Sequence, residues 1–260
     1  MDAPAPTQFL AKAAGTASTT LTVRHEQIRT SSMLTPRTSS ASPNEQEIDH
    51  LVDGIPHWYP AGHPTHGHWQ IPILPAPTID SLPTSSRAYD KRQRSSAETI
   101  LHGYLADRKL RTHARNPGRW VTRFQPYWGV ISPDFSIWLD QPPDRKLFAV
   151  RMSRAVGVFY ALRGIRVIPT LRWGDRRDYD FVFLGVESHS AVAISNYGLW
   201  LDPGLRQNFV NGLPEMVERI APDIVFLHGT TDHPAIRDLA RKTEVVPLIP
   251  DRTRIRMERG

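Results

Sequence analysis

Two short apolar runs, separated by a segment of helical length, constrain the fold of this chain more than any other feature. The first run, Trp128–Ser132, leads into Asp134, and the second, Ile165–Leu171, leads into Asp175. The segment between them, Lys146–Leu162, is closely followed by a glycine, which is the usual residue just beyond a helix end. A strand–helix–strand sequence of this kind predicts two parallel strands joined by a right-handed crossover.

The same alternation continues towards the C-terminal end. The further elements expected are a strand at Ala191–Ser195, a helix from Asp202-Pro203 to the residue before Pro222, a strand at Asp223–Leu227, a helix at Pro234–Arg241 and a strand at Glu244–Leu248. Pro214 is expected to kink or split the first of these helices. The strands are almost wholly apolar, as parallel strands buried on both faces must be. The pattern predicts an α/β fold of parallel (β/α) units, either an open doubly wound sheet or a barrel, and polar residues at nearly every strand end favour a partial or distorted (β/α) barrel.

Two stretches leave their secondary structure open. Ser95–Glu98 has the pattern of a capping box and predicts a helix, whereas Ile100–Leu105 followed by Asp107 equally suits a short strand. The apolar run Asp178–Val186 is too short for its periodicity to assign. Two other elements are expected upstream, namely an extended edge strand at Ile71–Pro75 and a helix from Asn116-Pro117 to Phe124.

The N-terminal part of the 260-residue chain differs in composition from the rest. Residues 1–54 are mostly Ala, Ser, Thr and Pro, and they can bury too little apolar area to offset the entropy of ordering, so we expect a disordered tail. Residues 55–250 are expected to form a single α/β domain, and residues 251–260 a basic C-terminal tail. The first residues lack a basic stretch followed by an apolar core, so no signal peptide is expected.

Charge and cysteine content limit the function classes. The chain has no cysteine, which excludes disulfides, thiolate metal sites and cysteine nucleophiles and is typical of a cytoplasmic protein. The net charge of +6 comes mostly from arginine, which binds phosphate in a bidentate manner, so nucleic acid is a candidate partner. No apolar run approaches the roughly 18 residues of a membrane span. Glycine-loop nucleotide motifs, the α/β-hydrolase motif and the zinc-protease motif are also missing from the sequence.

The residues that follow the strands are the candidates for a functional site. In parallel α/β folds, sites assemble at the carboxyl ends of the strands, where loops from several units converge. Asp134 and Asp175 are the candidate catalytic carboxylates, because such a pair can divide acid and base work or hold a divalent cation as cofactor. Tyr197 and His228 are expected to assist them in catalysis. The candidates for substrate binding are Trp173 and Asn196 at the strand ends, and Arg151 and Arg154 on the helix after Asp134.

Five of these candidates also have a structural interpretation. Asp134 and Asp175 follow Pro and Gly, where aspartate often forms a turn or a cap. Trp173 can pack against the domain, and Arg151 and Arg154 share a helical face that can be a solvated stripe.

A histidine-rich run could bind Zn²⁺ or Ni²⁺, but it lies in a Pro- and Gly-rich segment without a nearby carboxylate; its members are His57, His63, His66 and His68.

Several of these stretches together resemble a known protein family. They are Ser132-Pro133-Asp134-Phe135-Ser136, Ile168-Pro169-Thr170, Trp173-Gly174-Asp175, Phe181–Gly185 and Val192-Ala193-Ile194-Ser195. Over about residues 67–230, the chain resembles the family called domain of unknown function 4417. The resemblance implies a bacterial cytoplasmic protein of a kind also found in phages and mobile elements, and it favours a strand and turn at His102–Asp107. It implies no established activity, so it adds no role for Asp134 or Asp175.

Three functions are compatible with these observations. The first is a carboxylate-dependent enzyme, of hydrolase or phosphoryl-transfer type, that acts on a sugar- or nucleotide-containing substrate at the strand ends. The second is a nucleic-acid-binding accessory protein of a phage or mobile element, with arginines on phosphates and aromatic rings stacked on bases. The third is a non-catalytic structural or partner-binding protein. None of the three fixes an oligomeric state.

Overall fold

The computed structural model describes residues 51–52, 55–56, 58–91 and 96–248, which all lie within the compact unit Ala41–Gly260. Nearly all of the predicted N-terminal tail and the whole predicted basic tail, residues 251–260, lie outside the described residues. The described part begins with β1 (Leu51–Val52) paired antiparallel with β2 (Ile55–Pro56). Next, β3 (Thr65–His66) pairs antiparallel with β4 (Ile71–Pro72), which lies within the predicted extended strand.

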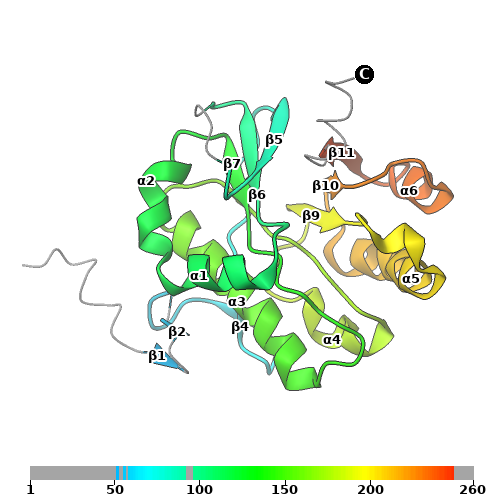
Figure 1. The fold of residues 1–260 in the computed structure, drawn as a ribbon, viewed down its shortest axis with the longest axis horizontal. Coiled ribbons are helices and arrows are strands. Elements are labelled where there is room, and N and C mark those ends of the chain that lie inside the picture. Colours follow the sequence, from blue (N-terminus) through cyan, green and yellow to red (C-terminus); the bar gives the residue numbers. More distant parts are fainter. Residues whose placement is uncertain (1–50, 53–54, 57, 92–95, 249–260) are drawn as a thin grey trace, which may run out of the picture. The chain divides into compact units, whose positions relative to one another are not determined.

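Two parallel sheets form the centre of the domain (Figure 1). The first has four strands in the order β5 (Ser85–Ala88), β6 (Thr99–His102), β7 (Gly129–Ile131) and β8 (Val167–Ile168). The second has three, in the order β9 (Ala191–Ser195), β10 (Ile224–His228) and β11 (Glu244–Leu248). Just beyond β8, Thr170 bridges to Ala193 in parallel, and the Leu171 N–H donates to the Ala193 carbonyl at 2.7 Å, so β8 and β9 are neighbours. The strands therefore lie side by side in the order of the chain, which confirms the predicted parallel α/β class.

The continuous series of strands from β5 to β11 has two faces that pack differently. On the outer face, side chains such as Leu101 and Val192 join the main hydrophobic core formed with the helices. On the inner face the strands pack against one another through a second cluster, which consists of Ile100, Trp128, Ile131, Ile168, Ala191, Ala193, Phe226 and Leu248. The ring of Trp128, just before β7, lies 5.8 Å from the ring of Phe226 in β10, so the sheet must curve strongly to bring these distant positions together. A closed barrel is not shown, because the outermost strands β5 and β11 do not pair within the part of the chain that is described.

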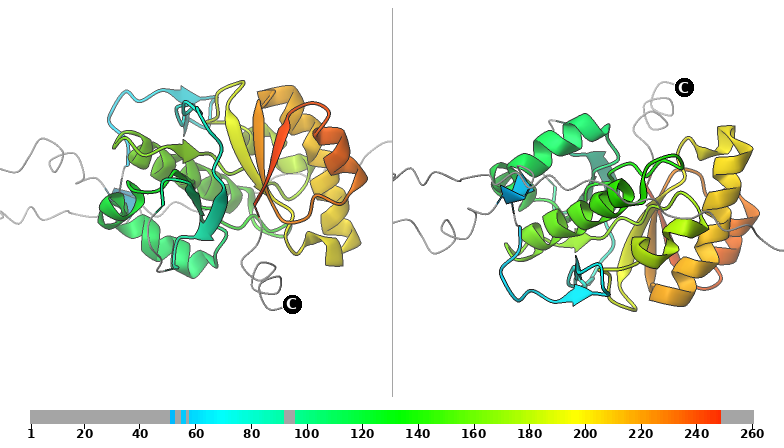
Figure 2. Two further views of the ribbon diagram at one scale, coloured as in Figure 1. Left: turned by 90° about the horizontal axis from the view of Figure 1, so that it is seen from above. Right: turned by 90° about the horizontal axis from the view of Figure 1, so that it is seen from below.

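Helices alternate with the strands and pack on the outer face. In order they are α1 (Asp107–Arg115), η1 (Pro117–Trp120), α2 (Val121–Phe124), α3 (Pro143–Ala161), η2 (Arg176–Asp178), α4 (Tyr179–Val182), η3 (Leu199–Leu201), α5 (Pro203–Ile220) and α6 (Pro234–Leu239). Several begin with proline, which fits the first turn because an N–H there would have no helical partner. Figure 2 shows β9, β10 and β11 side by side, with α5 and α6 along their flank.

Differences from the predicted elements have local causes. The strand alternative for residues 100–105 is right and the capping-box helix is wrong, because the Ser96 hydroxyl accepts the Glu98 N–H in a turn that leads into β6. The run that periodicity left open contains α4. α5 continues through Pro214 as one helix, so it is not split there. β5 and α1 were not predicted.

α1 is held against the domain by a buried histidine among aromatic rings. The His113 Nε2 atom lies 2.7 Å from the Tyr160 hydroxyl, and the His113 ring stacks on Tyr89 at 4.9 Å and packs against Trp120 at 4.3 Å. Burial, and secondarily the charge of Arg123, lowers the pKa of His113 from 6.5 to about 3. The folded protein therefore keeps His113 neutral well below neutral pH.

Because the folded protein holds His113 neutral, we expect the free energy of unfolding to fall on acidification. The unfolded chain protonates His113 below about pH 6.5, whereas the folded chain protonates it only near pH 3. The stability that the neutral His113 contributes is therefore complete above pH 6.5 and is lost as the pH falls towards 3. At about 1.4 kcal/mol per pH unit, the free energy of unfolding should fall by about 2 kcal/mol between about pH 7 and pH 5. Urea unfolding at both pH values measures the difference. His113→Phe should remove most of this pH-dependent difference in stability. The control His189→Asn, at an exposed site, should retain the difference. An unchanged pH dependence in His113→Phe would contradict this interpretation.

Candidate functional site

Polar side chains from successive strands meet at the carboxyl edge of the sheet. They are His102 and Tyr104 at the end of β6, Asp134 after β7, Thr170 and Arg172 after β8, Ser195 and Asn196 at the end of β9, and His228 at the end of β10. The parallel register of β9 and β10 pairs Ser195 with His228. The predicted location of a polar cluster at this edge follows from the parallel order of the strands.

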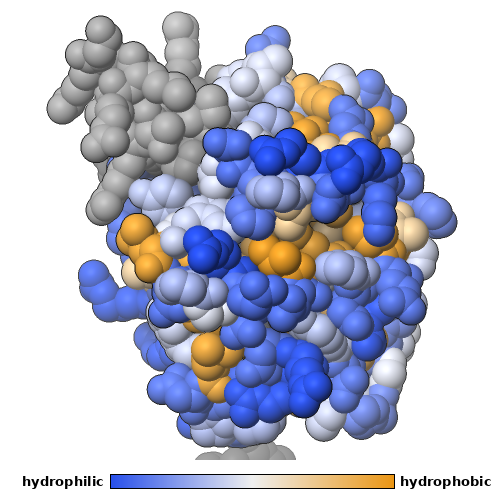
Figure 3. Space-filling model, turned by 90° about the vertical axis from the view of Figure 1, so that its right-hand side faces the viewer, coloured by the Kyte–Doolittle hydropathy of each residue, from blue (hydrophilic) through white to orange (hydrophobic). Residues whose placement is uncertain are grey.

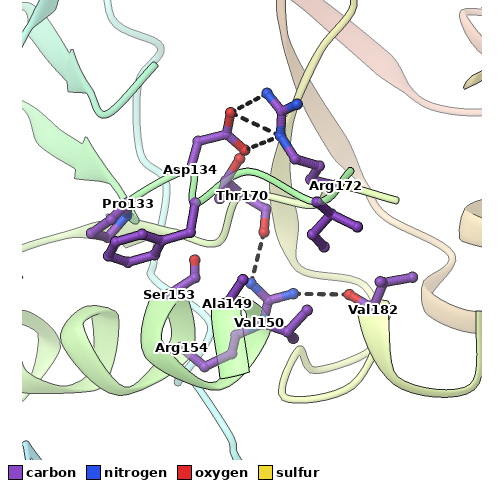
Figure 4. A pocket seen from close by; sticks show the side chains of 11 residues that line it. Pro133, Asp134, Ala149, Val150, Ser153, Arg154, Thr170, Arg172 and Val182 are labelled. Atoms are coloured by element: carbon purple, nitrogen blue, oxygen red, sulfur yellow. Dashed lines mark hydrogen bonds and ion pairs between the residues drawn. The ribbon is translucent and has the colours of Figure 1, made fainter. Parts of the chain in front are cut away.

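Asp134 is buried and makes an ion pair with Arg172. The Arg172 Nε atom donates to Asp134 Oδ1 at 2.9 Å and to Oδ2 at 3.1 Å, and Nη2 also contacts Oδ2 (Figure 4). The Asp134 side chain is 4% exposed and the Arg172 side chain 34%. Burial alone would lower the pKa of Arg172, but the charge and hydrogen bonds of Asp134 outweigh it and raise that pKa above its usual value. The pair thus keeps a charged guanidinium at the boundary between the core and the solvent.

A cluster of rings lies beside this ion pair. Tyr104 stacks on His228 with ring centroids 4.4 Å apart, and His102 and Tyr197 lie 5.1 and 5.4 Å from His228. The Ser195 Oγ atom lies 3.0 Å from His228 Nδ1. The ends of β6 and β9 therefore both contribute to the environment of the His228 imidazole at the end of β10.

Tyr104 connects the ring cluster with the ion pair. Burial, followed by the charge of Asp134, raises the pKa of the Tyr104 hydroxyl, while Thr170 and Arg172 oppose the shift. The Tyr104 and Thr170 hydroxyls are buried, and neither has a hydrogen-bond partner of standard geometry within the described residues. Tyr104 is therefore neutral at physiological pH and can donate a hydrogen bond.

Asn196, a predicted substrate-binding residue, holds a loop. Its Oδ1 atom accepts the Thr230 N–H at 2.9 Å, and its Nδ2 atom donates to the Thr230 carbonyl at 2.8 Å. Gly229 has a φ of +137°, and a Cβ there would lie 1.9 Å from Asn196 Oδ1. The amide group of Asn196 is thus engaged in joining the loops after β9 and β10.

Trp173, another predicted substrate-binding residue, packs on α5. Its ring stacks on Phe209 at 5.5 Å with an interplanar angle of 9°, and its Nε1 atom donates to the Asn208 carbonyl at 3.1 Å. A Cβ on Gly212 would lie 2.2 Å from Trp173 Nε1. The Trp173 side chain therefore fills a close contact between the β8 loop and α5.

Asp175 begins the short helix η2. Its carboxylate accepts the Arg177 N–H at 3.0 Å and makes an ion pair with the Arg177 guanidinium at 2.7 Å. These hydrogen bonds from Arg177 are the main reason that the pKa of Asp175 is lowered. Asp134 and Asp175 are thus bonded to different arginines, Arg172 and Arg177, and their predicted catalytic roles stay predictions.

The two arginines predicted on the helix after Asp134 have different environments. Arg154 is buried, and its guanidinium donates to the carbonyls of Thr170 at 2.7 Å, Val182 at 3.1 Å and Leu184 at 3.1 Å (Figure 4). Burial lowers the pKa of Arg154 to about 9. Arg151 donates to the Trp69 carbonyl at 3.5 Å. The interpretation of a solvated stripe is therefore wrong for Arg154, which joins α3 to the segments after β8 and α4.

Three hollows differ in their suitability for a ligand. One of about 10 Å³ lies beside the Asp134–Arg172 pair and has room for about one water molecule. A groove of about 840 Å³ lies between α1 and the first turns of α3. The third, of about 170 Å³, lies between α5 and α6, on the side shown in Figure 3, where hydrophobic patches lie among hydrophilic residues. Of the three, the groove beside α1 has the volume of a ligand site.

The histidine-rich segment makes local contacts. The His63 Nε2 atom lies 2.8 Å from the Ile73 carbonyl, His66 Nδ1 accepts the Gly185 N–H at 3.1 Å, and the His68 ring lies against Trp69 with centroids 4.1 Å apart and planes inclined by 41°. His57 lies outside the described residues. Within the described ranges there is no group of three or more His, Asp or Glu side chains that could share a metal ion. Over the same ranges, no helix has the length and apolar character needed to cross a membrane.

Sequence reasoning placed Arg172 among the residues at the strand ends but assigned it no role, and it did not identify Tyr104 as a member of the site. The role of Arg172 could have been found by asking which cation would neutralise a buried Asp134, since a buried carboxylate is normally paired. Tyr104 lay in the stretch whose secondary structure was left open, and its contact with His228 crosses the sheet. Only the first of these two residues left a usable signal in the sequence.

The chain is similar in sequence to phage proteins. The family model described as "Domain of unknown function (DUF4417)" matches residues 63–246, which confirms the resemblance seen in the motifs. The chain is 33% identical over 190 residues to the Gene 1 protein of Mycobacterium phage L5, an alignment that covers 72% of this chain and 82% of the phage protein. It is 31% identical over 170 residues to the Gene 1 protein of Mycobacterium phage D29, with 64% of this chain and 62% of that protein covered. No solved structure matches the chain significantly.

Proposed function

The chain belongs to the family of domain of unknown function 4417, and from its own side chains we propose that it is an enzyme of hydrolase or phosphoryl-transfer type. It acts on a nucleotide- or sugar-containing substrate at the carboxyl edge of the sheet. The observation that carries the proposal is the buried Asp134–Arg172 pair beside the Tyr104–His228 stack. The apolar cluster inside the curve of the sheet supports a partial (β/α) barrel as scaffold, and such scaffolds hold their sites at this edge.

Arg172 binds an anionic group of the substrate in this proposal. Its Nε and Nη2 atoms are bonded to Asp134, whereas its Nη1 atom has no hydrogen-bond partner within the described part of the chain. The side chain is partly exposed, so these remaining N–H groups can meet a ligand. A guanidinium held in one orientation suits a phosphoryl or carboxylate oxygen. Asp134 is then the positioning residue for Arg172.

His228 transfers a proton in this proposal. The Ser195 hydroxyl at Nδ1 and the stacked Tyr104 ring hold the imidazole in one orientation. Imidazole changes its protonation near neutral pH and is the most frequent general acid or base in enzymes. Tyr197, which is 47% exposed beside His228, contacts the substrate. Trp173, Asp175 and Asn196 support the loops around the site.

The binding step is tested with Arg172→Gln. We expect at least one compound, from a panel of nucleoside phosphates and sugar phosphates with and without Mg²⁺, to raise the melting temperature of the full chain. Because a hydrogen bond to a charged group contributes about 1.5–3 kcal/mol, Arg172→Gln should weaken the binding of that compound by roughly 10- to 100-fold. His228→Gln should leave binding within about tenfold and abolish turnover, measured as phosphate or sugar release.

Arg177→Gln is the matched control, because Arg177 also pairs with an aspartate, Asp175, but is itself exposed and lies outside the proposed site. It should leave the affinity unchanged. An equal loss of affinity in Arg177→Gln, or a wild-type protein that binds none of the compounds, would count against the enzyme. The second outcome would favour the non-catalytic partner-binding alternative.

A further inference from the structure

A mixed basic and aromatic groove lies between α1 and the first turns of α3. Its wall on α1 includes Arg111 and Arg115, its wall on α3 includes Arg145 and Phe148, and its base includes Phe135. We propose that this groove binds a single-stranded nucleic acid, with the arginines on phosphates and Phe148 under a base. The inference is independent of the proposed enzyme, because it uses none of the side chains assigned there.

The charges of this surface are available to an external anion. Arg111, Arg115 and Arg145 make no ion pair or side-chain hydrogen bond with any residue that the structure describes. Four other exposed arginines are paired with a carboxylate, namely Arg177, Arg219, Arg237 and Arg241. Among the described residues, Arg176 and Arg206 are also exposed and unpaired, but they lie outside the groove lining, as do Arg108 and Arg119. The segment that runs through α1, η1 and α2 contains no acidic residue after Asp107, and its basic residues are Arg108, Lys109, Arg111, Arg115, Arg119 and Arg123. A set of unpaired guanidinium groups on one surface is typical of phosphate binding.

Two carboxylates also line the groove, but one of them is already engaged. Asp107 accepts hydrogen bonds from the Ser136 N–H at 3.1 Å and the Ser136 hydroxyl at 2.9 Å. Asp144 lies in the first turn of α3, where the helix dipole stabilises a negative charge. The three arginines outnumber these two acids in the lining, and Arg108 and Arg119 extend the basic surface beyond it.

The apolar part of the groove favours a single-stranded nucleic acid over a duplex as the ligand. Phe148 is 40% exposed and lies beside Ala149 and Met152 on the α3 wall. An exposed ring of this kind stacks on an unpaired base, whereas the base faces of a duplex are covered by their neighbours. Arg111 and Arg115 are one helical turn apart, about 6 Å along the axis, so they can contact neighbouring phosphates of the same strand.

Fluorescence anisotropy of the full chain with a labelled oligothymidylate tests the proposal. Wild-type protein should bind the single strand more tightly than a duplex, and the affinity should fall with salt. The double variant Arg111→Gln/Arg115→Gln should bind at least about tenfold more weakly, and the slope of log K against log salt should fall by about 1.4, which corresponds to two lost phosphate contacts. Phe148→Ala should weaken binding by roughly 5- to 100-fold.

The control is Arg206→Gln/Arg237→Gln, which removes the same charge from exposed positions on α5 and α6. It should bind like the wild type. Arg111→Gln/Arg115→Gln should keep the wild-type melting temperature, because Arg111 and Arg115 have no ion-pair partner to lose among the described residues. Equal binding by Arg111→Gln/Arg115→Gln and the control would overturn the proposal. So would equal affinity for the duplex, or full displacement of the oligonucleotide by an equimolar poly-glutamate peptide, which would indicate an acidic protein partner.

Discussion

Replacing Gly212 by alanine is expected to lower the free energy of unfolding by about 3 kcal/mol, the upper end of the usual cost of overpacking a core. The new Cβ would lie 2.2 Å from Trp173 Nε1 and 2.4 Å from Cε2. Trp173 cannot withdraw easily, because its ring is stacked on Phe209 and its N–H is bonded to the Asn208 carbonyl. The new methyl group can therefore be accommodated only if α5 moves away from the sheet.

Urea unfolding of both proteins measures this loss. Gly118→Ala is the control, since the nearest atom to its Cβ would be 3.6 Å away, and it should change the stability by less than about 1 kcal/mol. Trp173→Leu combined with Gly212→Ala should be less destabilised than the sum of the two single variants, because the smaller side chain leaves room for the methyl group. A Gly212→Ala protein as stable as the wild type would show that Trp173 is not fixed in this contact.

The Trp-Gly-Asp motif was predicted to be part of the functional site, and the contact with Gly212 shows that Trp173 also supports a loop. Trp173 and Asp175 follow a strand at the edge where sites assemble, and the sequence around them has no feature that separates a loop support from a ligand contact. The distinguishing partner of Trp173 is Gly212, which lies in another helix, and the partner of Asp175 is the neighbouring Arg177. The Gly212 contact becomes evident only when the packing of α5 on the β8 loop is known, whereas Arg177 is a neighbour of Asp175 in the sequence.

Elements with a strong local pattern could be predicted from the sequence. β9 and β11 have the predicted bounds because each is a continuous run rich in β-branched or apolar residues. β5 has the sequence Ser-Ser-Arg-Ala, and its strand conformation depends on pairing with β6. α1 is mostly charged, and it is held by only three buried residues, Leu110, His113 and Ala114. These two elements were missed because tertiary contacts, rather than local preference, decide their structure.

The members of the candidate site also differ in whether they could be predicted from the sequence. Its position at the strand ends, and Asp134 and His228 as members, follow from the order of the strands. Arg172 and Tyr104 join through contacts between different loops. The groove beside α1 was invisible to the pattern analysis because α1 itself was not recognised.

A second buried ion pair supports the Trp-Gly-Asp loop from α3. The Lys146 Nζ atom lies 3.0 Å from Asp178 Oδ1 and 3.3 Å from Oδ2, and the two side chains are 4% and 3% exposed. Asp178 also accepts the N–H groups of Gly174 at 2.9 Å and Asp175 at 3.3 Å. A Cβ on Gly174 would lie 2.8 Å from Asp178 Oδ2, so only glycine permits this close approach. One carboxylate thus holds the loop, and one lysine neutralises it.

Lys146→Met is expected to destabilise the protein by about 3–5 kcal/mol, because it leaves the Asp178 carboxylate buried without a cation. Adding Asp178→Asn should recover part of this loss, since the amide is neutral and its oxygen can still accept the Gly174 N–H. Urea unfolding of the two single variants and the double variant gives the coupling energy. Arg237→Gln, which breaks the exposed pair with Asp232, should cost less than about 1 kcal/mol. If Lys146→Met were as mild as Arg237→Gln, or if the double variant were less stable than Lys146→Met alone, the charge of Lys146 would not be what holds the Trp-Gly-Asp loop in place.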